Sequence, residues 1–165
     1  DWKKLKDDVM ADGLYNEYRL AVAPNGSTSY INDSTASLTP IINRIEERQE
    51  KMIGKIYYPA PYLSNDTMPY YRSAYDMDMR TVIDTYAAAQ QHVDQSLSLT
   101  LFVRSTMPEG LYEWKNGRTN KMTTRDLNIL RHYAYKKGIK SIYYVRTFTD
   151  DNDEIGANQC ESCVI

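Results

Sequence analysis

Apolar side chains recur at helical spacing in four parts of the chain, and each pattern predicts an amphipathic helix. The four segments are residues 2–12, 67–77 and 79–93, and a stretch that Thr123 or Thr124 caps and Gly138 closes. In the first segment Trp2, Leu5 and Val9 share one face of the helix, and Gly13 follows as a stop signal.

Shorter runs rich in β-branched and aromatic residues predict strands at residues 17–23, 55–58, 96–103 and 141–147. Residues 41–58 are ambiguous as a whole, because their Glu-Glu-Arg-Gln-Glu-Lys run favours a helix by propensity. Helices and strands are mixed along the chain, with too few strands to form a closed sheet alone. The pattern therefore predicts a piece of a larger α/β fold.

Composition and charge exclude several classes of protein. The 165 residues are 42% apolar and 25% charged, which is typical of a soluble globular domain with a modest core. A net charge of -2 gives no electrostatic reason to expect binding to nucleic acid or to an anionic membrane. No apolar run approaches the roughly 20 residues of a membrane helix. The start at Asp1 is neither an initiator methionine nor a signal peptide, so we expect a fragment, or a chain processed from something longer.

The last eighteen residues, 148–165, are acidic and poor in apolar side chains, so they predict a flexible tail. Cys160 and Cys163, the only two cysteines, lie at its end and suit a reducing, cytoplasmic compartment. A structural zinc site would need further ligands, and His92 and His132 lie far apart in two predicted helices.

The Cys-x-x-Cys motif favours a redox role on a flexible tail over two more familiar uses of cysteine. A thioredoxin-type motif needs a helix that starts at the first cysteine, and a prenylation motif needs its cysteine fourth from the end. Neither fits Cys160 or Cys163. Two idle thiols remain an alternative. We favour a dithiol that cycles with a disulfide, because the spacing allows the ring to close and a flexible tail could carry it.

Tyr143 and Tyr144 are adjacent on a predicted strand. Because neighbouring side chains on a regular strand point to opposite faces, the pair by itself predicts one tyrosine in the core and one at the surface. Only the combination with a terminal dithiol suggests a role in electron transfer.

Residues 24–29, Pro-Asn-Gly-Ser-Thr-Ser, form a second candidate site. Gly26 has no Cβ, so backbone N–H groups could approach a ligand closely, and Ser27, Thr28 and Ser29 add hydroxyl donors. A helix that starts just after this loop would favour an anion such as a phosphate. The loop lacks the lysine of a nucleotide-hydrolysing P-loop. On spacing alone, an ordinary polar turn explains it better.

Three stretches together indicate a family. They are Ala-Pro-Asn-Gly-Ser-Thr-Ser-Tyr-Ile-Asn-Asp-Ser-Thr-Ala-Ser from Ala23, Lys-Ser-Ile-Tyr-Tyr from Lys140, and the terminal Cys-Glu-Ser-Cys-Val-Ile. In this order they closely resemble the C-terminal part of the large, catalytic subunit of class Ib ribonucleotide reductase. The stretches around Ile83, His92 and Met122 are similar to that family too.

The resemblance implies an α/β fold. Residues 1–147 would be the C-terminal portion of the family's ten-stranded α/β barrel, and residues 148–165 its flexible redox tail. Tyr143 and Tyr144 match the pair that relays a radical from the small subunit. Cys160 and Cys163 match the tail dithiol that re-reduces the active-site disulfide.

The resemblance also assigns the loop. Pro24, Asn25, Gly26, Ser27 and Thr28 match the residues that bind the diphosphate of a ribonucleoside diphosphate substrate. The family usually has Thr in place of Asn25 and Ile in place of Thr28. Both changes are small for a loop that works largely through backbone amides.

The family's thiyl-radical cysteine, active-site cysteines and effector site lie upstream of this segment. We therefore expect no metal and no cofactor in this chain, and no activity by it alone. The resemblance implies as partners an upstream large-subunit fragment, a small subunit with a dimanganese or diiron tyrosyl radical cofactor, and a glutaredoxin-like or thioredoxin-like redoxin. The alternative is a non-catalytic binding or regulatory module derived from the reductase. A free-standing dithiol protein fits poorly, because no scaffold activates the cysteines.

Overall fold

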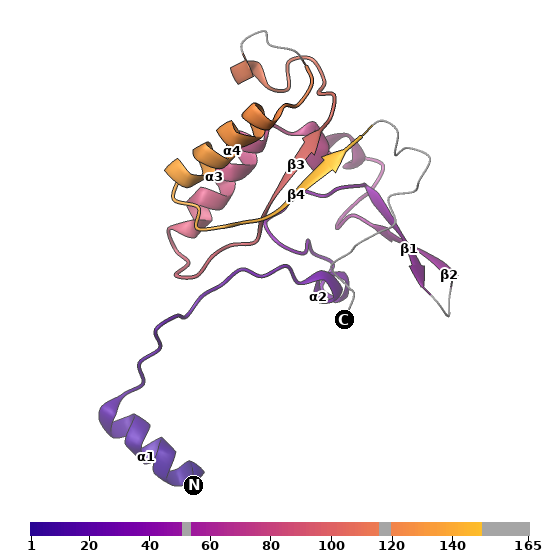
Figure 1. Cartoon of the computed structure of the whole chain (residues 1–165). Helices are drawn as coiled ribbons and strands as arrows, with labels where there is room; N and C mark the ends of the chain where they lie inside the picture. The colour runs from indigo at the N-terminus through magenta and orange to yellow at the C-terminus, as the bar shows by residue number, and fades with distance from the viewer. Residues whose placement is uncertain (51–53, 116–119, 150–165) are drawn as a thin grey trace.

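A parallel pair of strands, covered on one face by two helices, forms the body of the structure (Figure 1). The computed structural model describes residues 1–50, 54–115 and 120–149. In chain order the helices and strands are α1 (Trp2–Asp12), α2 (Gly26–Ile31), β1 (Ile45–Glu50), β2 (Gly54–Pro59), α3 (Met79–Gln90), β3 (Leu99–Arg104), α4 (Thr124–Lys136) and β4 (Ile142–Phe148). Short 3-10 turns lie at Met68–Tyr70, Ala74–Asp76 and Glu113–Lys115. The mixed α/β character predicted from the sequence is confirmed.

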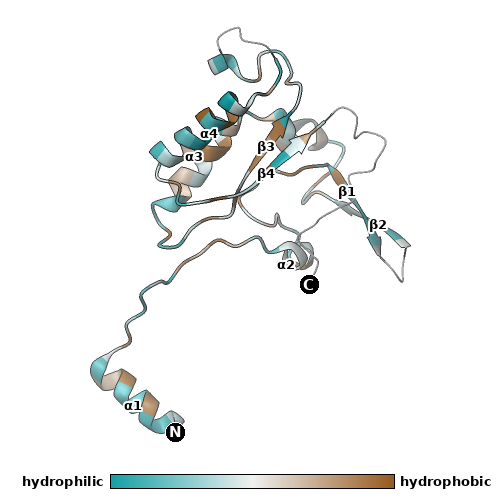
Figure 2. Cartoon of the chain, in the orientation of Figure 1, coloured by the Kyte–Doolittle hydropathy of each residue, from teal (hydrophilic) through white to brown (hydrophobic). Residues whose placement is uncertain are grey.

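The core lies between β3 and the two helices. Leu99 to Val103 are all buried, as expected for a parallel strand that is covered on both faces. From α3 the core takes Val82, Ile83 and Tyr86 among others, and from α4 it takes Leu130 and Ala134. Hydropathy shows the same division, with the apolar stretches of α3, α4 and β3 turned toward one another (Figure 2).

Both core helices begin where the sequence has a capping residue. The Asp78 side chain accepts a hydrogen bond from the Arg80 N–H and starts α3. Thr123 and Asp126 form a reciprocal capping box at the start of α4, as the sequence predicted for Thr123. At the other end Gly138 has φ of 83°, which glycine adopts without strain, and the chain turns there into β4.

The strand predicted at residues 17–23 is reduced to a single parallel bridge between Val22 and Leu97. Two backbone hydrogen bonds hold it, from the Gln95 N–H to the Leu20 carbonyl (3.1 Å) and from the Ser98 N–H to the Val22 carbonyl (3.2 Å). β3 and β4 thus form a two-stranded parallel sheet, and Val22 adds one parallel bridge at Leu97, just before β3.

The helix predicted at residues 67–77 is wrong. The segment forms two 3-10 turns, because Tyr71 and Ser73 adopt extended backbone angles between them. Pro69 lies in the first turn, where its missing N–H breaks no hydrogen bond. The Ser73 side chain accepts a hydrogen bond from the Tyr75 N–H and starts the second.

The segment at residues 41–58 was ambiguous, because its acidic and basic run at residues 46–51 favoured a helix by propensity, and the described part of that run is a strand. Residues 45–50 pair with residues 54–59 as an antiparallel hairpin, β1 and β2. The Lys55 ammonium lies 2.7 Å from the Glu47 carboxylate on the facing strand. The Tyr30 ring of α2 lies 4.4 Å from the Tyr58 ring. Cross-strand pairing has overridden a weak local preference.

α1 forms at the predicted residues and ends at Gly13, and it extends away from the body (Figure 1). Among the described residues, no helix combines the length and the hydropathy that crossing a membrane requires. The predicted tail lies almost wholly outside the described residues.

Candidate functional site

The loop at residues 24–28 leaves the sheet after Val22 and turns at once into α2. The first helical N–H that bonds a carbonyl of the same helix is that of Ser29, which donates to Asn25 (3.0 Å). The N–H groups of Gly26, Ser27 and Thr28 precede it, so they have no carbonyl of this helix to bind. Three adjacent N–H groups of this kind can bind an oxyanion.

The hydroxyl groups of the loop differ in their access to solvent. Ser29 is buried, and its hydroxyl donates a hydrogen bond of 2.6 Å to the Gly26 carbonyl. It is therefore not the ligand donor that the sequence suggested. Ser27 and Thr28 are exposed. A Cβ built on Gly26 would meet no heavy atom within 4 Å, so the space beside this residue is open.

A hollow of about 180 Å³ lies beside the loop. It is lined by Val22, Ala23, Asn25, Thr28, Ser29, Asn32, Ser34, Thr35, Ala36, Ser37 and Leu38. The Asn25 N–H donates to the Ala36 carbonyl (2.8 Å) and so joins the two sides of the hollow. None of these lining residues is charged, so an anion bound here would meet backbone N–H groups, hydroxyls and the side-chain amides of Asn25 and Asn32.

A buried tyrosine fixes the far side of the hollow. Tyr86 on α3 is fully buried, and its hydroxyl lies 2.7 Å from the Thr39 hydroxyl and 3.2 Å from that of Ser37. The Ser98 hydroxyl donates to the Val22 carbonyl (3.2 Å). These polar contacts connect α3, the start of β3 and the loop. They attach the wall of the hollow to the buried core.

Asp94, in the turn between α3 and β3, fastens the segment that leads into the loop. Its carboxylate accepts the N–H groups of Arg19 (2.7 Å) and Leu20 (2.8 Å). These backbone hydrogen bonds, that of Leu20 first, hold the pKa of Asp94 below its ordinary value, because they favour the ionised form.

The structure corrects the expectation that one of the two adjacent tyrosines lies in the core. Tyr143 is 50% exposed and Tyr144 is 43% exposed. Leu99 pairs with Ile142 but Thr100 pairs with Tyr144, so the register shifts by one residue and Tyr143 has no partner. An extra residue of this kind lets two adjacent side chains leave the same side of a strand.

As a result the rings of Tyr143 and Tyr144 are neighbours. Their centroids lie 4.2 Å apart, with an angle of 58° between the ring planes. Arg146 follows two residues later, and its guanidinium carbon lies 5.9 Å from the Tyr144 ring centroid. Ile142 and Val145, on either side of the pair, pack against the core and hold the strand in place.

The pairing register places the loop and the tyrosine pair at similar positions along the direction of the strands. Val22 is level with Leu97, and Leu99 is level with Ile142, so the chain leaves the sheet at Pro24 close to the level of Tyr143. Both sites therefore lie on segments that pair with one short stretch of chain, Leu97 to Thr100.

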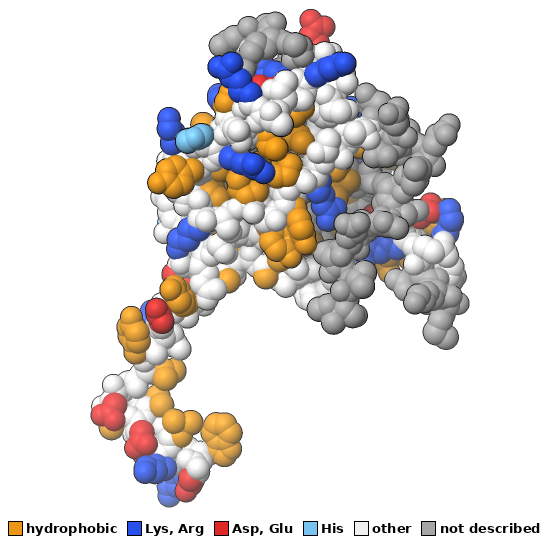
Figure 3. All heavy atoms as spheres, in the orientation of Figure 1, with side chains coloured by type: hydrophobic (Ala, Val, Ile, Leu, Met, Phe, Trp, Pro, Cys, Tyr) orange, Lys and Arg blue, Asp and Glu red, His pale blue; other side chains and the backbone are white. Residues whose placement is uncertain are grey.

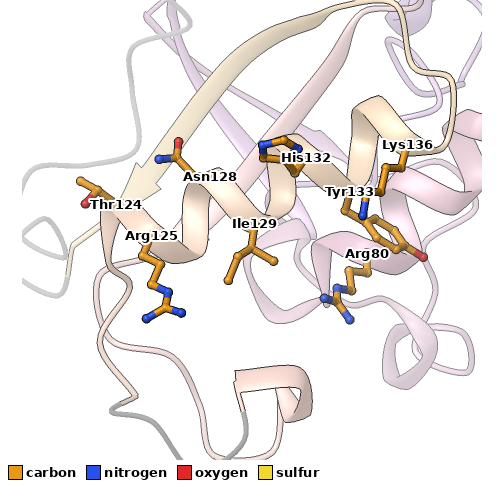
Figure 4. Close-up of a pocket in the computed structure, with 8 residues that line it drawn as sticks. All are labelled: Arg80, Thr124, Arg125, Asn128, Ile129, His132, Tyr133 and Lys136. Carbon is orange, nitrogen blue, oxygen red and sulfur yellow. The ribbon is translucent and has the colours of Figure 1, made fainter.

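A basic groove of about 570 Å³ runs along α4 (Figure 4). Its lining includes Arg80, Arg125, His132 and Lys136 and no acidic residue. The Arg80 guanidinium lies between two rings, 4.6 Å from the Trp114 ring and 5.0 Å from the Tyr133 ring. The sequence analysis did not single out this groove, although the recurrence of basic residues at helical spacing from Arg125 was a visible signal.

Cys160 and Cys163 lie outside the described residues, so their role stays a prediction. Within the described ranges, no group of three or more His, Asp or Glu side chains could hold a metal ion. The sequence analysis also overlooked Asp94 and Arg146. An acidic residue in a turn gave no hint of a partner 74 residues away, whereas Arg146 could be placed beside Tyr144 from the two-residue period of a strand.

The fold and the loop define a class of protein: an α/β segment with a candidate ligand loop that follows a parallel bridge to the sheet segment. A family model described as "Ribonucleotide reductase, barrel domain" matches residues 1–145. The chain therefore belongs to the ribonucleotide reductase barrel-domain family, and its resemblance to class Ib large subunits is confirmed. The ten-stranded barrel itself stays a prediction.

Relatives support the same family. The chain is 47% identical over all its residues to the ribonucleoside-diphosphate reductase subunit alpha of Bacillus subtilis (strain 168), of which it covers 21%. It is 48% identical to the nrdEB subunit alpha of Bacillus phage SPbeta, covering 13% of that protein. It is 44% identical to the subunit alpha of Mycoplasma pneumoniae, covering 22%. The chain thus spans about a fifth or less of each relative.

Replacing Asp94 with Ala should release the segment that leads into the loop. We expect faster hydrogen exchange at the Arg19 and Leu20 amides, measured by NMR at pH 7, and a smaller change in Asp94→Asn, which keeps one acceptor oxygen. Because the folded-state pKa is depressed, the fastening is fully present above the ordinary carboxyl pKa of about 3.9 and is lost as the pH falls through the lower pKa of the folded state. Asp66→Ala, at another exposed aspartate, is the control; equal exchange in both Ala variants would contradict the assignment.

Proposed function

We propose that this chain is the part of a ribonucleoside-diphosphate reductase large subunit that supplies three components. These are the substrate phosphate loop (Pro24, Asn25, Gly26, Ser27 and Thr28), the tyrosine radical relay (Tyr143 and Tyr144) and the reducing tail dithiol (Cys160 and Cys163). The observation that carries the proposal is the sheet register, because the loop and the tyrosine pair follow segments that pair with the same stretch of chain, Leu97 to Thr100.

The loop has the properties that a diphosphate requires. Three N–H groups without a helical carbonyl partner precede Ser29, and the exposed Ser27 and Thr28 hydroxyls add donors. Hydrogen bonds to a charged acceptor are worth about 1.5–3 kcal/mol each, so a few of them suffice without a cation in the loop. The open space beside Gly26 leaves room for a phosphate oxygen to approach the backbone.

The tyrosine pair suits transfer of a radical from another protein. The two rings lie 4.2 Å apart, so a hole can move between them in one short step. About half of each side chain is exposed, which leaves access for a donor on a separate subunit. The radical source we propose is a small subunit with a dimanganese or diiron tyrosyl radical cofactor.

The overall reaction we propose replaces the 2'-hydroxyl of a ribonucleoside diphosphate with hydrogen, by radical chemistry that begins at C3'. The hydroxyl leaves as water. A dithiol supplies the two electrons and two protons, and is oxidised to a disulfide. Cys160 and Cys163 would reduce that disulfide by exchange, and a glutaredoxin-like or thioredoxin-like redoxin would then recharge them. The thiyl-radical cysteine would come from an upstream large-subunit fragment, so this chain alone is inactive.

Co-purification tests the proposal as a whole. This chain is tagged and expressed beside an upstream fragment of a large subunit, and the complex is weighed under native conditions. We expect a stoichiometric complex that forms deoxyribonucleoside diphosphate once the small subunit is added. A folded chain that does not bind the upstream fragment would instead support a non-catalytic binding module. Product formed by this chain alone would overturn the proposal.

Gly26→Ala tests the phosphate loop. The new Cβ meets no atom of the chain, and Gly26 has no positive φ, so the folded state should be unchanged or about 0.4–1 kcal/mol more stable. It would intrude on a bound phosphate, and we expect the KM for the ribonucleoside diphosphate in the assembled enzyme to rise roughly tenfold or more. Thermal unfolding of the same variant is the control. An unchanged KM would remove the loop from the substrate site.

Tyr143→Phe and Tyr144→Phe test the relay. Each variant keeps the ring and its packing but loses the phenolic proton, so turnover in the assembled enzyme should be abolished while substrate binding stays nearly intact. Tyr70→Phe is the matched control, since Tyr70 also belongs to an adjacent tyrosine pair and is 83% exposed. Full activity of either relay variant would show that the assignment is wrong.

Cys160→Ser combined with Cys163→Ser tests the tail. Turnover driven by a protein redoxin should stop, because no dithiol remains to pass on its electrons. Turnover driven by dithiothreitol should persist in part, because a small dithiol can reach the active-site disulfide directly. Loss of both activities would point to a structural role for the tail.

A further inference from the structure

α1 presents an apolar face that nothing in the described part of the chain covers. Trp2 is 86% exposed and Leu5 is 52% exposed, and α1 has no buried residue. Together with Val9 these side chains lie on one side of the helix, at positions i, i+3 and i+7. Figure 3 shows the helix away from the body, with hydrophobic and charged side chains at its surface.

The segment that joins α1 to the body is also exposed and apolar. Leu14, Tyr15 and Tyr18 are 69%, 85% and 57% exposed. The first hydrogen bonds from this part of the described chain to the body are those of Arg19 and Leu20 with Asp94. The described stretch before Arg19 thus has no hydrogen bond that ties it to the body.

α1 has too little to stabilise it by itself. An isolated helix shorter than about 12–15 residues is marginal in water, and α1 has 11 residues. Its Asp1 cap, which accepts the Lys3 N–H (3.1 Å), adds only about 1 kcal/mol. A stable α1 helix therefore needs another surface that buries its apolar face.

The match to the barrel-domain model points to the rest of that domain as this surface. It includes residues 1–145, so α1 belongs to the barrel domain and is no appended tag or linker. Most of each alpha-subunit relative lies outside the aligned segment. We propose that the Trp2, Leu5 and Val9 face of α1 docks in an apolar groove on the upstream part of the barrel domain. This inference rests on the proposed function and names the element that makes the assembly.

The opposite side of α1 provides a matched control. Lys4 and Asp7 point away from the apolar face at 100° per residue. Leu5→Ser with Val9→Ser removes two side chains that docking would bury, whereas Lys4→Ser with Asp7→Ser introduces the same residue type into the same helix. Fully burying a Leu or Val contributes roughly tenfold or more to association, so the first variant should bind about 100-fold more weakly and the second unchanged.

The experiment uses the full 165-residue chain and its two double variants. The partner is one of the alpha-subunit relatives, truncated just before the residue that aligns with Asp1, and the dissociation constant is measured by native mass spectrometry and calorimetry. Circular dichroism of each chain alone and hydrogen exchange at Arg19 and Leu20 verify that the body stays folded. Weaker binding only in Leu5→Ser/Val9→Ser supports the inference.

Three other outcomes overturn it and can be told apart. If all three chains bind the upstream fragment equally, α1 is not the docking element, while the proposed function stands. If no chain binds, the proposed function fails and the inference with it. Self-association of the unmixed chain that Leu5→Ser/Val9→Ser abolishes would assign the face to a second copy and would also overturn the proposal.

Discussion

Pairing of β3 with β4, and of Leu97 just before β3 with Val22, is the constraint from which the rest of the arrangement follows. Val22 on one side and β4 on the other set the height at which the loop leaves the sheet and at which the tyrosines stand. The shift of one residue opposite Leu99 keeps Ile142 and Val145 in the core and turns both tyrosines out of it. A regular ladder would have separated the two rings.

Two candidate anion sites on this chain differ in their chemistry. The hollow beside the loop has no charged lining residue and offers N–H groups, which are fixed by the backbone and would lose no side-chain entropy on binding. The groove along α4 instead gathers basic side chains, with Arg80 between two aromatic rings. The first arrangement favours precise placement of one group, and the second provides a broad positive surface.

In the described part of the chain, the apolar side chains between β3, α3 and α4 are well buried, whereas many large apolar side chains elsewhere are exposed. Leu99 to Val103 are buried, whereas α1 and the segment after it expose large apolar side chains. Contiguous exposed apolar surface of this kind marks a site of association. Membership in the barrel-domain family agrees with it, since the chain spans about a fifth or less of its alpha-subunit relatives.

The sequence by itself determined α1, α3, α4 and the β3 and β4 strands, because their apolar periods, caps and glycine stops act over a few residues. It also determined the family, because three motifs in one order are specific where each alone is not. Only the tertiary structure decided that residues 45–50 form a strand, that Ser29 turns inward, and that Tyr143 and Tyr144 share one side of β4. The last of these depends on a register shift against β3, more than forty residues earlier in the chain, and no local pattern records a pairing at that distance.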